Sequence, residues 1–146
     1  MRLPSIACLL LAPVLLHAQA PADREGVRRA AMDYLEGFYE GDSTKHLRSV
    51  RPEVYKYGFY KPAADKPYQG NQMTWAGFMD FTRNVRTRKN FAPATAPKEV
   101  VILEVEDQTA AVRVNAWWGM DYLLMGKFDG RWMITHVLWQ SPPPKP

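Results

Sequence analysis

The stretch Lys127-Phe128-Asp129-Gly130-Arg131-Trp132-Met133-Ile134 decides the fold of this chain. Its Asp-Gly pair favours the tight turn of a β-hairpin, because both central residues of that turn need positive φ angles. Branched and aromatic residues fill the segments on either side, 121–128 and 131–140, as is typical of strands. We therefore predict two antiparallel strands joined at Asp129-Gly130.

Two further segments before this hairpin also show the alternation of strands. Residues 99–106 place Val101, Leu103 and Val105 on one face and Glu104 and Glu106 on the other. Residues 109–118 alternate in the same way, with Val112, Val114 and Ala116 on one face. Together with the hairpin, they predict four consecutive antiparallel strands.

Helical spacing dominates the first half of the chain. Between residues 23 and 39, apolar side chains recur along one helical face: Val27, Ala30, Ala31, Tyr34, Leu35, Phe38 and Tyr39. Asp23 can cap this helix and Gly41 can end it. A short helix follows Asp42-Ser43, and a third begins after Thr74, while residues 51–70 fit either a strand or an ordered loop. Helices followed by strands predict an α+β fold with helices on one face of the sheet.

The first twenty residues have the features of a secretory signal peptide. Arg2 precedes an apolar run over residues 3–16, and Ala18-Gln19-Ala20 has the small residues that signal peptidase recognises, so cleavage is expected after Ala18 or Ala20. The run is too short for a stable membrane span and contains prolines, which predicts no permanent membrane anchor. We expect a periplasmic or secreted protein with one domain over residues 21–140 and a proline-rich tail over 141–146.

Charge and composition exclude several classes of function. The formal net charge of +4 in 146 residues is dispersed among acidic neighbours, so nucleic acid is not an expected partner. Cys8 is the single cysteine, and the histidines have no metal-ligand spacing, so neither a thiolate site nor a metal site is expected. No glycine-rich phosphate loop is present in the sequence, and no cofactor is expected.

Two stretches resemble a known family. Residues 34–42, Tyr-Leu-Glu-Gly-Phe-Tyr-Glu-Gly-Asp, with Arg51-Pro52-Glu53 after them, resemble the opening of the "putative lumazine-binding" group of the NTF2-like superfamily. Residues 121–139 resemble its last hairpin. The resemblance implies a cone with a cystatin-like fold, in which helices pack on the concave face of a curved antiparallel sheet, a cavity lies at the open end, and two copies form a homodimer. None of these motifs is catalytic.

Aromatic side chains are the expected ligand-binding groups. A cone of this kind could stack a small aromatic or apolar molecule on its rings, with polar groups to orient it. The candidate ligand-binding residues are Tyr34, Tyr57, Trp75, Trp117, Tyr122 and His136. The leading hypothesis is therefore an exported binding domain without evident catalysis.

The sequence is also compatible with two other functions. An isomerase, dehydratase or cyclase like ketosteroid isomerase or the SnoaL cyclases would use Asp121 or His136 as the base and a tyrosine as hydrogen-bond donor. The structural alternatives are a turn cap for Asp121, a partly buried structural role for His136 and a solvated His46. A dimeric interaction module would use one of the tryptophans Trp117 and Trp118, which are expected on opposite faces of a strand.

Overall fold

The computed structural model describes residues 19–142 of the chain, in three helices and six strands. The predicted signal peptide lies outside the described residues except for positions 19 and 20, as do residues 143–146 of the tail. The elements follow in the order α1 (Gln19–Glu40), α2 (Ser43–Ser49), β1 (Val50–Tyr60), β2 (Gln69–Met73), α3 (Trp75–Thr87), β3 (Glu99–Val105), β4 (Thr109–Ala116), β5 (Gly119–Phe128) and β6 (Arg131–Gln140).

The six strands form one curved sheet in the order β2-β1-β6-β5-β4-β3. The four predicted strands β3 to β6 are consecutive antiparallel neighbours. The segment over residues 51–70 holds both alternatives: residues 51–60 belong to β1, residues 61–68 form a loop, and residues 69 and 70 begin β2. The sheet is not antiparallel throughout, because β1 pairs with β6 in parallel.

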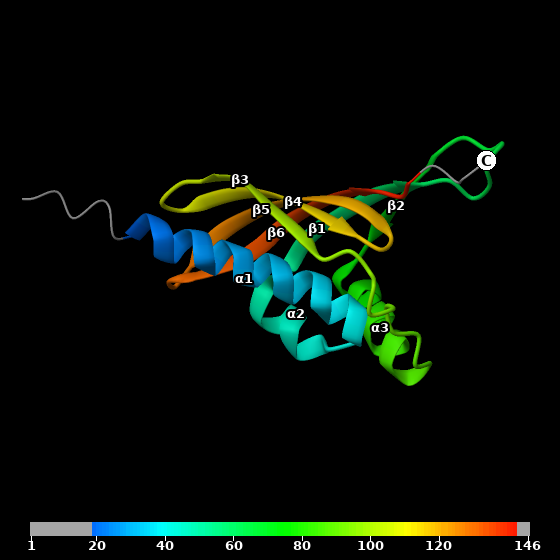
Figure 1. Cartoon of the computed structure of the whole chain (residues 1–146), viewed down its shortest axis with the longest axis horizontal. Helices are drawn as coiled ribbons and strands as arrows, with labels where there is room; N and C mark the ends of the chain where they lie inside the picture. Colours follow the sequence, from blue (N-terminus) through cyan, green and yellow to red (C-terminus); the bar gives the residue numbers. More distant parts are fainter. Residues whose placement is uncertain (1–18, 143–146) are drawn as a thin grey trace, which may run out of the picture.

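The helices lie against the concave face of the sheet, as Figure 1 shows, and the predicted α+β layering is confirmed. The predicted stripe of α1 is buried against the sheet, and Phe78, Met79, Thr82 and Val85 bury one side of α3. Burying a large apolar side chain stabilises a fold by about 1.5–3 kcal/mol. This shared core therefore fixes α1 and α3 relative to the strands.

Asp23 does not cap α1, because the helix begins four residues earlier, at Gln19. Its carboxylate instead accepts a hydrogen bond from the Trp132 indole at 3.0 Å and pairs with the Lys127 ammonium at 2.6 Å. The other predicted caps are confirmed. Gly41 ends α1 at φ +61°, and the side chains of Asp42 and Thr74 accept backbone N–H bonds at the starts of α2 and α3.

The hairpin at Asp129-Gly130 is confirmed. Both residues have positive φ, 48° and 76°, as a two-residue hairpin turn with the twist of its strands requires. Trp117 and Trp118 were expected on a strand, but they form the turn between β4 and β5.

Two β-bulges change which side chains face the core. In β3, Leu103 is the extra residue between the pairs Ile102–Val112 and Glu104–Ala111, so Val100 and Ile102 contact the core and Leu103 is exposed. In β6, Thr135 is the extra residue between Ile134 and His136. A bulge inserts one residue into a period of two, so side chains beyond it exchange faces. The predicted inward face of residues 101, 103 and 105 was therefore wrong in part.

Candidate functional site

Three polar side chains meet inside the cone, on α1, β1 and β5. Alternation along β1 turns Lys56 inward, between Val54 and Gly58, and only 4% of the residue is exposed. Its ammonium donates to the Tyr34 hydroxyl at 2.6 Å and lies 3.6 Å from the Asp121 carboxylate. The Tyr34 hydroxyl in turn donates to Oδ2 of Asp121 in a short hydrogen bond. Lysine, tyrosine and aspartate thus form a continuous buried chain.

Asp121 is fully buried, so it does not cap a turn at an exposed strand edge. It pairs with Val114 on β4 and with Trp139 on β6, both of which turn inward. Its second oxygen, Oδ1, accepts from the Trp118 indole N–H at 2.8 Å. Both carboxylate oxygens therefore have a donor, as a buried carboxylate requires.

Burial shifts the pKa values of Lys56 and Tyr34 in opposite directions. It lowers the pKa of the Lys56 ammonium, and the attraction of Asp121 works against that shift. Burial also raises the pKa of Tyr34 well above its ordinary value, with a further contribution from the negative charge of Asp121. Tyr34 consequently keeps its proton at neutral pH and remains a donor.

Lys56 also borders a cavity of about 250 Å³ at the open end of the cone. The other lining residues are Phe38, Met73, Phe81, Trp118 and Trp139, so the ammonium is the single charged group on this wall. An apolar protein cavity of about 150 Å³ can hold benzene. The cavity is therefore large enough for a molecule with one ring or with two fused rings.

Gly58 shapes one wall of this cavity. It pairs with Trp139 across β1 and β6, and a Cβ atom at this position would collide with the indole ring. Glycine therefore allows the Trp139 ring to lie flat over β1, where its centre is 5.8 Å from the Lys56 ammonium. The centres of the Tyr34 and Phe38 rings lie 5.2 and 5.5 Å from the same nitrogen. Aromatic faces thus replace water around the lysine.

A second cavity, of about 280 Å³, shares Phe38, Phe81 and Trp118 with the first. Its remaining wall comes from α1, the end of α3 and the turn before β5, including Trp117. Trp117 is half exposed, and its backbone N–H donates to the Tyr39 hydroxyl at 2.7 Å. Trp118 therefore borders both cavities, together with Phe38 and Phe81.

His46 is fully buried, so the expectation of a solvated side chain was wrong. Its ring packs beside Phe38 and Phe78, and its two nitrogens lie 2.9 Å from the Tyr34 carbonyl and 3.0 Å from the Thr82 hydroxyl. A carbonyl can only accept, so Nε2 carries the proton. The single proton of the Thr82 hydroxyl is shared between Nδ1 and the Phe78 carbonyl, each 3.0 Å away. Burial lowers the pKa of His46 to about 4, which fits this neutral ring.

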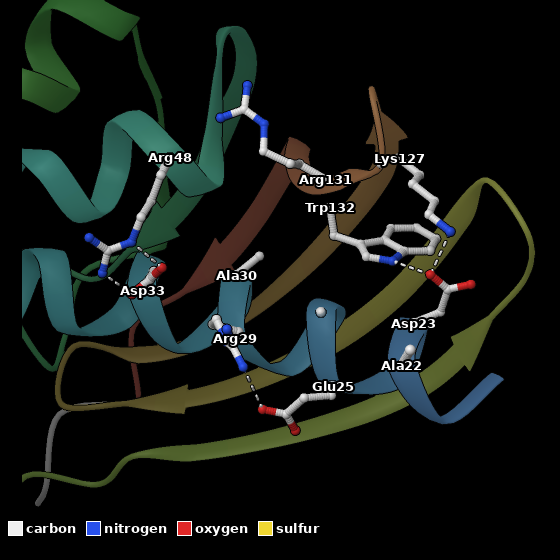
Figure 2. A pocket seen from close by; sticks show the side chains of 12 residues that line it. Ala22, Asp23, Glu25, Arg29, Ala30, Asp33, Arg48, Lys127, Arg131 and Trp132 are labelled. Carbon is white, nitrogen blue, oxygen red and sulfur yellow. Dashed lines mark hydrogen bonds and ion pairs between the residues drawn. The ribbon is translucent and has the colours of Figure 1, made fainter. Parts of the chain in front are cut away.

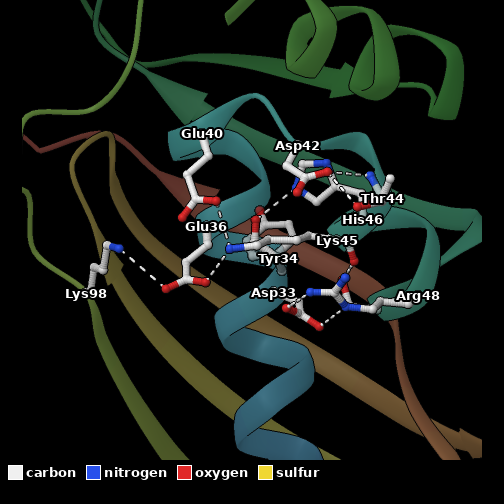
Figure 3. A network of polar contacts seen from close by, with 11 residues as sticks. Asp33, Tyr34, Glu36, Glu40, Asp42, Thr44, Lys45, His46, Arg48 and Lys98 are labelled. Atoms are coloured by element: carbon white, nitrogen blue, oxygen red, sulfur yellow. Dashed lines mark hydrogen bonds and ion pairs between the residues drawn. The ribbon is translucent and has the colours of Figure 1, made fainter. Parts of the chain in front are cut away.

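Ion pairs surround His46 on the outer side of α1 and α2, as Figure 3 shows. The Arg48 guanidinium donates two hydrogen bonds of 2.6 Å to the Asp33 carboxylate. The Lys45 ammonium lies 2.6 Å from the Glu36 carboxylate and 2.8 Å from that of Glu40. These contacts hold α2 on α1. Their charges are partnered, so they serve the fold and not a ligand.

A broad depression of about 740 Å³ lies between the start of α1 and the β5–β6 hairpin (Figure 2). Half of its lining residues are exposed, and its acidic groups already have basic partners: Asp23 with Lys127, Glu25 with Arg29, and Asp33 with Arg48. It has greater volume than the cavity at Lys56, yet it contains no buried unpaired group that would orient a ligand. The cavity beside Lys56 is the better candidate site.

The structure brings together only part of the predicted site. Tyr34 contacts Asp121 beneath the cavity, Trp75 stacks on Phe78 at the start of α3, and Trp117 lines the second cavity. Tyr57, Tyr122 and His136 instead occupy the outer face of the sheet, away from the cone. His136 is exposed and not partly buried, because the bulge at Thr135 turns it outward.

Lys56 is the central residue that the sequence analysis missed. A lysine between Tyr55 and Tyr57 is an ordinary choice for an exposed strand position. The available signal was its alternation with Val54 and Gly58, which places all three on one face.

Within residues 19–142, no three His, Cys, Asp or Glu side chains cluster suitably for a metal ion. None of the helices in that range is long and apolar enough to cross a membrane.

Comparison with known families settles the class of this domain. The sequence profile of the family described as "Putative lumazine-binding" matches residues 22–140. The chain belongs to this family. Its matched range spans α1 through β6, so the cluster at Lys56 lies inside the family domain. No curated protein matches the chain.

Solved structures show the same fold. An NTF2-like protein from Methylobacillus flagellatus has a TM-score of 0.64 at 17% identity, covering 83% of this chain and 93% of that one. One from Shewanella baltica has a TM-score of 0.60 at 19% identity, covering 84% and 96%. An NTF2-like protein with a cystatin-like fold from Novosphingobium aromaticivorans has a TM-score of 0.60 at 12% identity, covering 92% of both chains. The predicted NTF2-like cone is confirmed.

Proposed function

We propose that this domain is exported and binds a small flat molecule in the cavity beside Lys56. The observation that carries the proposal is a buried ammonium facing an otherwise apolar, aromatic wall. Small-molecule sites typically combine such walls with a few placed polar groups. The ligand is a mono- or bicyclic ring with a carbonyl or carboxylate oxygen directed at the lysine.

The hydrogen-bond capacity of Lys56 supports an acceptor on the ligand. An ammonium carries three N–H donors. Within the described residues, Tyr34 is its one hydrogen-bond acceptor, while Asp121 lies at ion-pair distance. A donor is therefore left for a ligand oxygen at the cavity wall. A charge-assisted bond of this kind contributes about 1.5–3 kcal/mol.

Proton-transfer catalysis by Asp121 receives less support from the geometry. Neither Asp121 nor Tyr34 lines the cavity, and both Asp121 oxygens are occupied by Trp118 and Tyr34. A substrate would need to displace Trp118 or Lys56 to reach the carboxylate. The binding function needs no such movement.

Thermal unfolding with a library of aromatic aldehydes, ketones and carboxylates, including lumazine, tests the binding proposal. A ligand at one hundred times its Kd stabilises the folded state by about 2.7 kcal/mol, which raises the Tm by about 10 °C in a domain of this size. Phe81→Ser should weaken binding at least about tenfold, since Phe81 forms the cavity rim and is 49% exposed, so its loss spares the core.

Phe91→Ser is the matched control. Phe91 is 48% exposed and does not line the cavity, so its loss should leave ligand affinity unchanged. Equal weakening by both substitutions, or a library that leaves the Tm unchanged, would contradict the proposed site.

We further propose that two copies associate through the outer face of the sheet. Apolar side chains lie in adjacent rows there. The exposed Leu138 on β6 pairs with the exposed Tyr122 on β5 and with the partly buried Tyr57 on β1. Tyr55 and Leu124 flank His136 in the next row. An apolar patch of this kind favours a partner with an identical patch, as in a twofold dimer.

Leu138→Glu should shift the protein to monomers, weakening self-association at least about a hundredfold, because it places a carboxylate at the centre of this face. Leu47→Glu is the control, since Leu47 is 57% exposed on α2, which is not on the outer face of the sheet, and Leu138 is 51% exposed. Sedimentation equilibrium measures both. A wild-type monomer at high concentration would exclude the dimer.

A further inference from the structure

Lys56 has the surroundings of a nucleophilic amine. It borders the cavity, three aromatic rings surround its nitrogen, and its one hydrogen-bond partner among the described residues is a hydroxyl linked to a carboxylate. We infer that Lys56 forms a reversible imine with an aldehyde or ketone group of the molecule bound in this cavity. This inference rests on the proposed binding function and names the reactive group of the ligand.

The chain Lys56–Tyr34–Asp121 gives the amine a way to lose its proton. Tyr34 accepts from the lysine and donates to the aspartate, so a proton can pass from Nζ to the phenol oxygen while the phenol proton passes to Oδ2. The products are a neutral amine, an unchanged phenol and a protonated carboxyl group. The transfer creates no net charge, and burial lowers its cost because two buried charges become a neutral pair. The ion pair remains the resting state of the site.

The charged and titratable groups around Lys56 come from three other elements. Asp121 on β5 favours the charged ammonium of Lys56, whereas burial disfavours it. The ring of His46 on α2 is neutral and adds no charge near the lysine. Tyr34 on α1 keeps its hydroxyl proton and can relay a proton from Lys56 to Asp121. Reactive lysines in other proteins are made nucleophilic by the same loss of water around the ammonium.

The reaction balances within this site. The Nζ lone pair attacks the carbonyl carbon, and one Nζ proton passes to the carbonyl oxygen to give a carbinolamine. Nζ then takes back the proton held by the Tyr34–Asp121 pair and passes one proton to the hydroxyl group, which leaves as water. One carbonyl and one ammonium give one protonated imine and one water, with the Asp121 carboxylate restored and no oxidant or reductant. Water leaves through the cavity mouth beside Phe81 and Trp118.

Reductive trapping tests the inference on the full-length protein. The protein is incubated with benzaldehyde and sodium cyanoborohydride at pH 7, and the benzylated lysines are mapped by peptide mass spectrometry over time. We expect Lys56 to be labelled at least about tenfold faster than Lys66, whose side chain is 60% exposed. The advantage should shrink towards pH 10, where exposed lysines also lose their protons.

Benzyl alcohol separates failure of the imine from failure of the binding proposal. It has the same ring without the carbonyl, and its binding is followed by the Tm. If it raises the Tm while Lys56 is labelled no faster than Lys66, the imine is excluded and the binding site stands. If benzyl alcohol leaves the Tm unchanged and benzaldehyde labels Lys56 no faster than Lys66, both the imine and the binding site are contradicted. Benzyl alcohol should slow Lys56 labelling and leave Lys66 unchanged.

Tyr34→Phe tests the relay. It keeps the ring that packs on Phe38 and Phe78 but removes the hydroxyl between lysine and aspartate. Labelling of Lys56 should fall to the rate of Lys66, while benzyl alcohol still binds. An unchanged rate in this variant would show that the amine reacts without the relay. The wild-type map decides the inference should this variant fold poorly.

Discussion

Replacing Asp121 by alanine is expected to lower the free energy of unfolding by about 3–5 kcal/mol, because it breaks a buried ion pair. The change leaves the Lys56 ammonium buried without its counter-charge. It also removes the acceptor of the Tyr34 hydroxyl and of the Trp118 indole. Unfolding in urea, followed by tryptophan fluorescence, measures the loss.

The double variant Lys56→Met with Asp121→Leu separates the ion pair from the packing. Removing both charges together should recover much of the stability lost by the single substitution, because no unpaired charge remains in the core. Glu53→Ala is the control for a carboxylate in an exposed pair. Glu53 binds Arg51 on the surface, so its loss should change stability by no more than about 0.5 kcal/mol. A loss below about 1 kcal/mol for Asp121→Ala would contradict a buried ion pair.

Local sequence patterns predicted the elements of this fold well. The stripe of α1, the caps at Asp42 and Thr74, and the turn at Asp129-Gly130 depend on residues within a few positions of each other. Their physical causes, such as a side-chain oxygen beside free N–H groups, are visible in a short stretch of chain. The family resemblance then supplied the curvature of the sheet.

The bulges show where local patterns fail. Nothing within β6 alone marks Thr135 as an extra residue, because the bulge depends on how β6 pairs with β5. Its consequence is large, since it turns His136 and Leu138 outward and Val137 and Trp139 inward. A base candidate was thereby assigned to the wrong face of the sheet.

The site itself depends on contacts between distant segments. Tyr34, Lys56 and Asp121 come from three elements, separated by 22 and 87 positions in the hydrogen bonds that Tyr34 makes. The sequence analysis offered Asp121 as a base and a tyrosine as its hydrogen-bond donor. It could not show that Tyr34 and Asp121 meet, nor that β1 would place a lysine beside them.

Acid should destabilise this protein through His46 before its carboxylates contribute. In the unfolded chain His46 has a pKa near 6.5, whereas burial lowers the folded pKa to about 4. Between these values the unfolded state binds a proton that the folded state does not, so stability falls as the pH falls from about 6.5 towards 4. The loss is about 2 kcal/mol between pH 7 and pH 5 and about 3 kcal/mol at pH 4.

His46→Gln should flatten this pH dependence. The glutamine amide can still donate to the Tyr34 carbonyl but takes up no proton in the unfolded chain, so the variant should lose stability at pH 7 and gain relative to wild type at pH 5. His136→Gln is the matched control, since its exposed ring should leave the pH profile unchanged. Urea unfolding at half-unit intervals from pH 7.5 to pH 5 resolves the difference. A wild-type profile that stays flat over this range would mean that the folded protein can protonate His46, and the neutral bridge between Tyr34 and Thr82 would be wrong.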